Sequence, residues 1–268
     1  MESSNPILSR YGRNGRGYAS MGNPNVGRTG YSTSYDAVEG KELEDLYNAP
    51  AASPLQTGRM TMDDVVTRTA MLFGLLVITS AFAWQAALGG AILFGSFAVA
   101  LVLGMVIAFS RKVRPALILV YAGLQGIVLG TISRVYEASY PGIVSQALLA
   151  TAGAFVGVLF AYRTGRIRIT ARATKFALAA IIGYLVLGII NIIGGNFIFN
   201  NGTFGPFVAL FGVGLATFFL AMDFDQAAKA VAIGVPQQES WRVGFGMMVS
   251  VIWLYLEVLR LLSILRRD

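Results

Sequence analysis

Apolar residues in this chain form long runs, separated by short connectors that carry glycine, proline or charge. A helix needs about 20 apolar residues to cross the roughly 30 Å hydrocarbon core of a bilayer. Runs of that length cover residues 67–88, 90–110, 114–136, 141–163, 174–195, 205–227 and 241–265. The pattern predicts an all-α polytopic membrane protein, with seven transmembrane helices in residues 61–268.

The first 60 residues follow a different pattern. The stretch SRYGRNGRGYASMGNPNVGRTGYSTSYD is rich in Gly, Arg, Ser, Asn and Tyr, with no apolar period of 2 or 3.6. Such a segment buries too little apolar surface to offset the entropy lost on ordering. No apolar core follows its first basic residues, so it does not resemble a signal peptide. Residues 1–60 are therefore predicted to be a disordered polar tail.

Composition narrows the classes of function. The chain is 55% hydrophobic and 13% charged, whereas a soluble domain carries about a quarter charged residues. It contains no histidine and no cysteine, which removes thiolate and histidine-based catalysis and the common zinc and haem sites. MDFD and LYLE also lack the Gly-x-Gly-Asp pattern of intramembrane aspartyl proteases. We expect no enzyme and no cofactor.

Basic residues indicate the orientation of the chain. The net charge is +7, and eight basic residues fall in two connectors, 111–114 and 163–175. Without a folded polar face around them, these clusters do not indicate nucleic-acid binding. They mark cytoplasmic loops by the positive-inside rule, which places the N-terminus in the cytoplasm. Seven spans would put the basic C-terminal LRRD outside, so the last helix is either fixed by packing or re-entrant.

Glycine pairs recur at four-residue spacing. Gly126 with Gly130, and Gly153 with Gly157, fit the small-xxx-small pattern of closely packed membrane helices. Close helix packing is the first interpretation of both pairs, and the lining of a pore is the alternative.

Three acids stand in or next to apolar runs. Asp223 and Asp225 lie at the end of the sixth run, and Glu257 lies near the middle of the seventh. A charged side chain at the centre of a membrane helix costs about 2.5–3.5 kcal/mol on insertion scales, so it is a functional-site hypothesis by default. Arg260, three residues after Glu257, is a possible charge partner on the same helix face.

The spacing of the acids limits how they meet. Residues two apart on a helix diverge by about 200°, so only one of Asp223 and Asp225 can face Glu257. Two facing carboxylates would share a proton and titrate together, which makes a proton-operated switch. They would also begin a weak Ca²⁺ site, formed by Asp225 and Glu257 with carbonyls and water. The other acid would be solvated at the helix end.

Two motifs carry a family resemblance. The aromatic–acid step Phe224-Asp225-Gln226 is followed in the last run by Leu254-Tyr255-Leu256-Glu257. With the block RPALILVYAGLQGIVLG at 114–130, this pattern resembles the Bax inhibitor-1 family (transmembrane BAX inhibitor motif proteins) in a bacterial form. The resemblance implies a bacterial plasma-membrane protein with a central last helix wrapped by the others.

The resemblance also implies a calcium leak gated by pH through two facing acids. Glu257 matches the acid of the last helix, and Asp225 matches that of the sixth, or Asp223 if the alignment is shifted. This chain differs by carrying Glu rather than Asp at 257, and by Arg260, which could hold Glu257 ionised or block a cation path.

Two classes of function follow. The first is a pH-sensitive cation (Ca²⁺) leak channel gated by an intramembrane di-carboxylate pair. The alternative is a non-transporting regulatory protein that acts on membrane proteases or stress-response complexes through its polar tail. Deleting residues 1–55 would leave flux intact in the first case and remove the regulatory effect in the second. Proton-coupled transport of another solute would leave a similar sequence.

Overall fold

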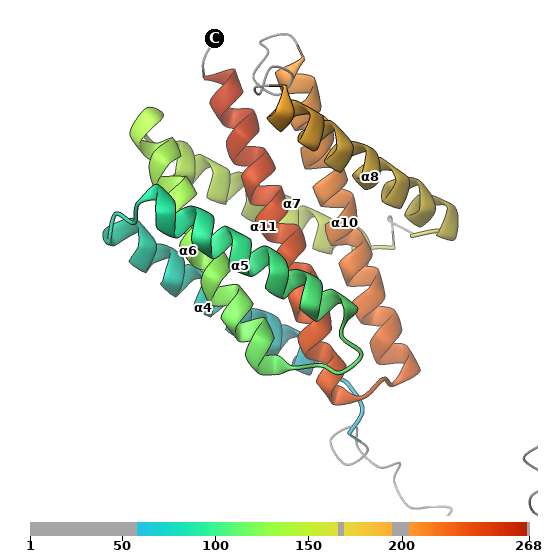
Figure 1. The fold of residues 1–268 in the computed structure, drawn as a ribbon. Helices are drawn as coiled ribbons and strands as arrows, with labels where there is room; N and C mark the ends of the chain where they lie inside the picture. Colours follow the sequence, from blue (N-terminus) through green and yellow to red (C-terminus); the bar gives the residue numbers. More distant parts are fainter. Residues whose placement is uncertain (1–57, 166–168, 195–203, 267–268) are drawn as a thin grey trace, which may run out of the picture. The chain divides into compact units, whose positions relative to one another are not determined.

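The computed structural model describes residues 58–165, 169–194 and 204–266 (Figure 1). Its helices are α4 (Met62–Gln85), α5 (Gly90–Phe109), α6 (Pro115–Ser139), α7 (Ile143–Arg163), α8 (Ala171–Ile193), α10 (Gly205–Ile233), the short 3₁₀ helix η1 (Gln237–Glu239) and α11 (Ser240–Leu265). Seven of them are long and apolar enough to cross a membrane. The prediction of a seven-helix membrane protein is therefore confirmed, while the predicted disordered tail lies almost entirely outside the described residues.

The first helix begins earlier than its apolar run. The apolar run starts near residue 67, but the preceding stretch TMDDVV, with Asp63 and Asp64 as a cap and as negative charge in the first turn, indicates a start within residues 61–66. In the structure Thr61 is the N-cap: the Asp64 backbone N–H donates to Thr61 Oγ1 (3.1 Å), and Thr61 N–H donates to Asp64 Oδ2 (3.0 Å). This reciprocal capping box satisfies two N–H groups that a helix start leaves open. A polar first turn is thus part of the helix, although apolar periodicity does not reveal it.

The helix that carries Asp223 and Asp225 continues beyond its predicted end at residue 227. It runs to Ile233 and stops at Gly234, whose φ of 72° is a left-handed conformation suited to glycine. The added segment is rich in alanine, the best helix former. Both acids therefore lie more than two helical turns before the end of α10, and not at the junction of a helix with a polar loop.

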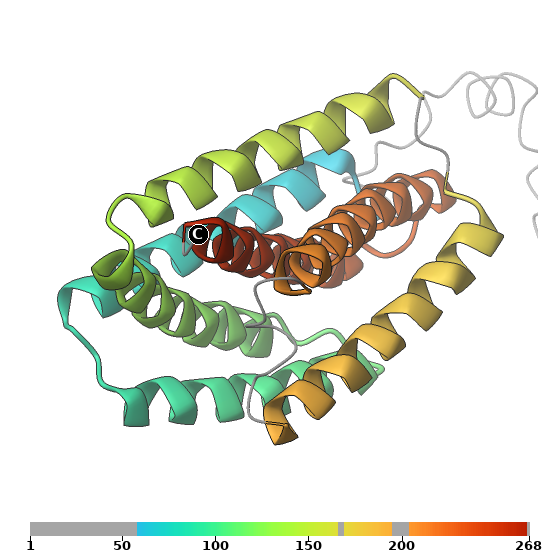
Figure 2. The ribbon, with the colours of Figure 1, turned by 90° about the horizontal axis from the view of Figure 1, so that it is seen from above.

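The last helix occupies the middle of the bundle. In Figure 2 α11 lies among the other helices, and it packs against α4, α6, α7 and α10. The most apolar 18-residue stretch of α11 is 56% buried within the protein, whereas the corresponding stretch of α8 is 11% buried. Helix α5 packs on α6, and α8 packs on α10 at the periphery. The central last helix that the family resemblance implies is confirmed.

The outward faces of the peripheral helices are apolar. Side chains such as Phe94 and Phe109 on α5, and Phe176 and Ile182 on α8, are more than 60% exposed. A water-soluble monomer rarely exposes contiguous apolar surface of this kind. Together with the seven long apolar helices, this surface identifies a multi-pass membrane protein.

The end of the bundle at which α4 and α11 begin is held together by the residues that precede α4. We call it the basic end, after Arg111, Lys112 and Arg114 in the α5–α6 connector, Arg163 at the end of α7 and Arg172 at the start of α8. Met60 N–H donates to the Val235 carbonyl (2.8 Å), and Gln237 N–H donates to the Gly58 carbonyl (2.9 Å). Arg68 of α4 also donates to the Gln237 carbonyl. The α10–α11 connection is thereby fastened to the start of the first helix.

The two glycine pairs behave differently. A Cβ added at Gly130 of α6 would lie 2.9 Å from the Ser80 carbonyl carbon and Cα of α4, and one added at Gly126 would lie 3.0 Å from Thr79 Cβ. Close packing is therefore confirmed for the pair on α6. Cβ atoms added at Gly153 and Gly157 of α7 would meet nothing within 4 Å among the described residues. The expectation of close packing is wrong for that pair within the described chain.

Replacing Gly130 with alanine is expected to destabilise the protein by about 1–3 kcal/mol, because the new methyl group meets backbone that cannot rotate aside. Reversible unfolding in mixed detergent micelles measures this cost. Gly153→Ala is the matched control: it adds the same methyl group to open space and should leave stability unchanged or slightly raised. Equal stability of the two variants would contradict the packing described for α4 and α6.

Candidate functional site

Glu257 is a buried acid in the middle of α11, with only 6% of the residue exposed. Its Oε1 accepts two hydrogen bonds, one from the Tyr184 hydroxyl of α8 (2.6 Å) and one from Trp253 Nε1 (3.1 Å). Trp253 stands one helical turn before Glu257, so both side chains lie on the same face of α11. The carboxylate is therefore fixed by a neighbouring helix as well as by its own.

Arg260 supplies the positive charge of this cluster. Its Nη2 lies 2.7 Å from Glu257 Oε2, and the same nitrogen donates to the Tyr184 hydroxyl (2.7 Å). The guanidinium carbon lies 5.9 Å from the centre of the Tyr184 ring, within reach of a cation–π contact. Tyr184 thus receives a hydrogen bond from Arg260 and gives one to Glu257. The Glu257–Arg260 pair expected from their i, i+3 spacing is present.

Gly212 of α10 makes room for the cluster. A Cβ built at this position would lie 2.6 Å from both Glu257 Oε2 and the Tyr184 hydroxyl. Any side chain here would displace the carboxylate or the hydroxyl. The charged cluster, defined as Tyr184, Gly212, Trp253, Glu257 and Arg260, therefore lies where α8, α10 and α11 meet.

Asp223 of α10 also faces α11, at a position nearer the basic end than Glu257. The Ser250 hydroxyl donates to Asp223 Oδ2 (2.5 Å). A Cβ added at Gly246, one turn before Ser250, would lie 3.4 Å from Asp223 Oδ1. The carboxylate is thus held in the interface between α10 and α11, away from the end of either helix.

Asp225 takes another direction. Its Oδ2 lies 2.5 Å from Lys229 Nζ, one turn further along the same helix, and the Lys229 side chain is 62% exposed. Between the two acids, the Phe224 ring packs edge-on against Phe155 of α7 at 5.3 Å between ring centres. The two acids diverge around α10, as their spacing predicts.

A comparison with known protein families tests the resemblance that these motifs carry. The sequence of residues 5–267 matches the family described as Bax inhibitor 1 like. The chain belongs to this family. None of the curated proteins compared with the chain matches it. The resemblance inferred from Phe224-Asp225-Gln226 and Leu254–Glu257 is therefore confirmed over essentially the whole chain.

The structure of this Bax inhibitor 1-like protein does not bring Asp225 and Glu257 together. Asp225 pairs with Lys229 and Glu257 with Arg260. The acid that reaches α11 is Asp223, and its partner Ser250 is seven residues from Glu257, about 10.5 Å along the helix. The two inward acids therefore occupy separate levels of one interface. In the described ranges, His, Cys, Asp and Glu nowhere form a group of three or more that could hold a metal ion.

Sequence reasoning did not find Tyr184, Gly212, Trp253 or Ser250. Tyr184 is a lone hydroxyl-bearing residue in the apolar run IIGYLVLG, and Trp253 precedes Glu257 by one turn. The latter spacing was a usable signal, since i and i+4 side chains meet on a helix. Tyr184 and Gly212 come from other helices, and only their packing shows that they contact the acid.

Proposed function

We propose that this protein is a pH-sensitive cation leak, with Ca²⁺ as the permeant ion, in a bacterial plasma membrane. The observation that carries the proposal is a buried acid, Glu257, which forms an ion pair with Arg260 in the central helix of a membrane bundle. Asp223 adds a second acid in the α10–α11 interface, nearer the basic end. Cations would pass between these two levels along α11. The positive-inside rule supports a cytoplasmic location for the basic end.

The Glu257–Arg260 pair accounts for a closed state. A guanidinium 2.7 Å from Oε2 occupies the face of the carboxylate that a cation would need, and Oε1 is already hydrogen-bonded to Tyr184. Protonation of Glu257 would remove the negative member of the pair and leave Arg260 without its counter-charge. An unpaired buried charge is unfavourable, so α11 would repack against α8 and α10. That repacking is the proposed opening step.

Both inward acids have defined surroundings from which pH sensitivity would arise. Glu257 is faced by Tyr184 from α8, by Trp253 and Arg260 on its own helix, and by Gly212 from α10. Asp223 is faced by Ser250 of α11. Loss of charge at either acid changes a contact made by α11, which links protonation to the packing of the central helix.

Calcium flux into liposomes, measured between pH 6 and pH 8, tests the proposal. Wild type is expected to change its flux across this range, and Glu257→Gln with Asp223→Asn to lose that dependence. Asp225→Asn is the matched control on the same helix. It should change flux by less than about fivefold, because its partner Lys229 is 62% exposed, and an ion pair with a solvated member contributes at most about 1 kcal/mol. Identical flux in wild type and the Asp223–Glu257 double variant would overturn the proposal.

A further inference from the structure

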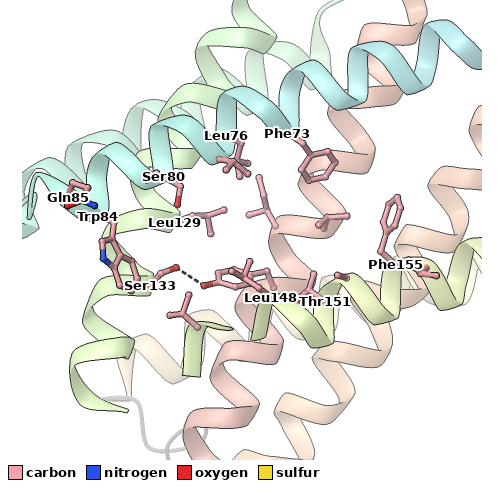
Figure 3. Close-up of a pocket in the computed structure, with 18 residues that line it drawn as sticks. Phe73, Leu76, Ser80, Trp84, Gln85, Leu129, Ser133, Leu148, Thr151 and Phe155 are labelled. Atoms are coloured by element: carbon pink, nitrogen blue, oxygen red, sulfur yellow. Dashed lines mark hydrogen bonds between the residues drawn. The ribbon is translucent and has the colours of Figure 1, made fainter. Parts of the chain in front are cut away.

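A large cleft lies on another side of the central helix. It has a volume of about 700 Å³ and is lined by α4, α6, α7 and α11 (Figure 3). Its walls include exposed apolar residues, Val77 of α4 and Leu148 and Val156 of α7, each more than half exposed. Its inner wall includes Ile252 of α11, which is buried. The cleft therefore reaches from the lipid-facing surface to the core of the bundle.

The size and position of this cleft suit a ligand from the membrane. Protein interiors are packed about as densely as organic crystals, with few voids larger than a water molecule. A volume of about 700 Å³ is instead within the range of ligand pockets, about 300–1,000 Å³. Every residue that lines it belongs to a membrane-spanning helix. The molecules next to its opening are therefore lipids, whose apolar chains match its walls.

One end of the cleft is polar. Trp84 and Gln85, at the end of α4 far from the basic end, line it there. Ser133 and Tyr255, whose hydroxyl oxygens are 2.6 Å apart, also line the cleft. Indole rings favour the interface between lipid tails and head groups. The cleft thus has an apolar body and a polar end, as an amphiphile requires.

A basic side chain lies at this polar end of the cleft. Arg134 is exposed and donates one hydrogen bond from Nη1 to the Trp84 carbonyl (2.6 Å). A guanidinium carries five N–H donors in a planar fork that suits phosphate oxygens. Held beside Trp84, it offers the charge complement of an anionic head group at the level where head groups lie.

The wall of the cleft also contains an unsatisfied hydroxyl. Thr151 of α7 is 6% exposed, and its Oγ1 has no hydrogen-bond partner among the residues that the structure describes. An unpaired buried polar group is unfavourable. A ligand oxygen at this position would remove that cost. The ester carbonyl is the acceptor of this kind that a phospholipid supplies.

We propose that this cleft binds an acyl chain of an anionic phospholipid from the surrounding membrane, with the phosphate held by Arg134. The site is distinct from the charged cluster. Tyr255 faces the cleft and Glu257 faces α8, and residues two apart diverge by about 200° on a helix. The lipid therefore contacts α11 on the side away from Glu257.

Native mass spectrometry of the full chain in detergent, titrated with dioleoyl phosphatidylglycerol, tests this site. Ala152 lines the cleft, and Ala152→Phe would fill it, so we expect apparent affinity to fall at least about tenfold. Ala150, on the same helix, is exposed and is not part of the lining. Ala150→Phe should bind as wild type does. Arg134→Gln should remove the preference for phosphatidylglycerol over phosphatidylcholine.

Wild-type binding by Ala152→Phe, or equal losses in both alanine variants, would overturn the proposal. A dimer peak that forms only without lipid would instead show that a second copy covers the cleft. Photo-crosslinking of unmodified protein in vesicles containing phosphatidylglycerol with a diazirine acyl chain avoids any folding defect of a variant. We expect labelled peptides from α4 and α7 around Val77 and Leu148. Even labelling over α5 and α8 would contradict a specific site.

Discussion

Replacing Arg260 with glutamine is expected to destabilise the folded protein by about 3–5 kcal/mol, the cost of leaving one charge of a buried ion pair without its partner. Glu257 is 6% exposed, so water cannot replace the lost guanidinium. Tyr184 would also lose the hydrogen bond that Arg260 donates. Unfolding in mixed micelles at neutral pH measures the difference between this variant and wild type.

A double-mutant cycle separates the energy of the Glu257–Arg260 interaction from the effect of changing either side chain alone. Glu257→Gln combined with Arg260→Gln removes both charges and should recover most of the stability lost in Arg260→Gln, so that the two effects do not add. Lys229→Gln, which breaks the Asp225–Lys229 pair at its 62% exposed lysine, should cost at most about 1 kcal/mol. If Arg260→Gln costs no more than Lys229→Gln, the buried pair is not a structural element.

The sequence predicts the fold better than it predicts the contacts of the site. Apolar runs locate seven membrane helices because bilayer thickness fixes their length. The Glu257–Arg260 pair was also predictable, since i, i+3 neighbours meet on one helix face. Both results depend on local geometry, which the order of residues determines directly.

Which of the two acids of α10 reaches α11 depends on helix rotation, which local geometry does not determine. Spacing shows that Asp223 and Asp225 diverge, but it does not say which one turns inward. In the structure Phe224 packs on α7, and Asp223 is turned toward Ser250 of α11. The family motif favoured Asp225 because it follows the aromatic residue. The apparent end of the apolar run at residue 227 likewise concealed that α10 continues to Ile233.

From the contacts of the charged cluster we predict opposite effects for two glycine-to-alanine substitutions in α10. Gly212→Ala would place a methyl group 2.6 Å from Glu257 Oε2 and the Tyr184 hydroxyl. We expect a cost of about 1–3 kcal/mol, since neither group can move without breaking the network. Gly214→Ala, two residues further on, adds the same methyl group where nothing lies within 4 Å. Alanine favours helix over glycine by up to about 1 kcal/mol, so this variant should be neutral or more stable.

The same two variants connect the cluster to the proposed leak. Suppose that Gly212→Ala destabilises the closed state and leaves the open state unchanged. A destabilisation of about 1–3 kcal/mol then raises the open population by about 5- to 150-fold. Calcium flux at pH 8 should then rise by a factor in that range, while Gly214→Ala should match wild type. A destabilised Gly212→Ala with unchanged flux would show that the cluster supports the fold without closing a path. Such a result would place the gate elsewhere in the α10–α11 interface, with Asp223 and Ser250 as the next pair to change, because they form the other level at which an acid contacts the central helix.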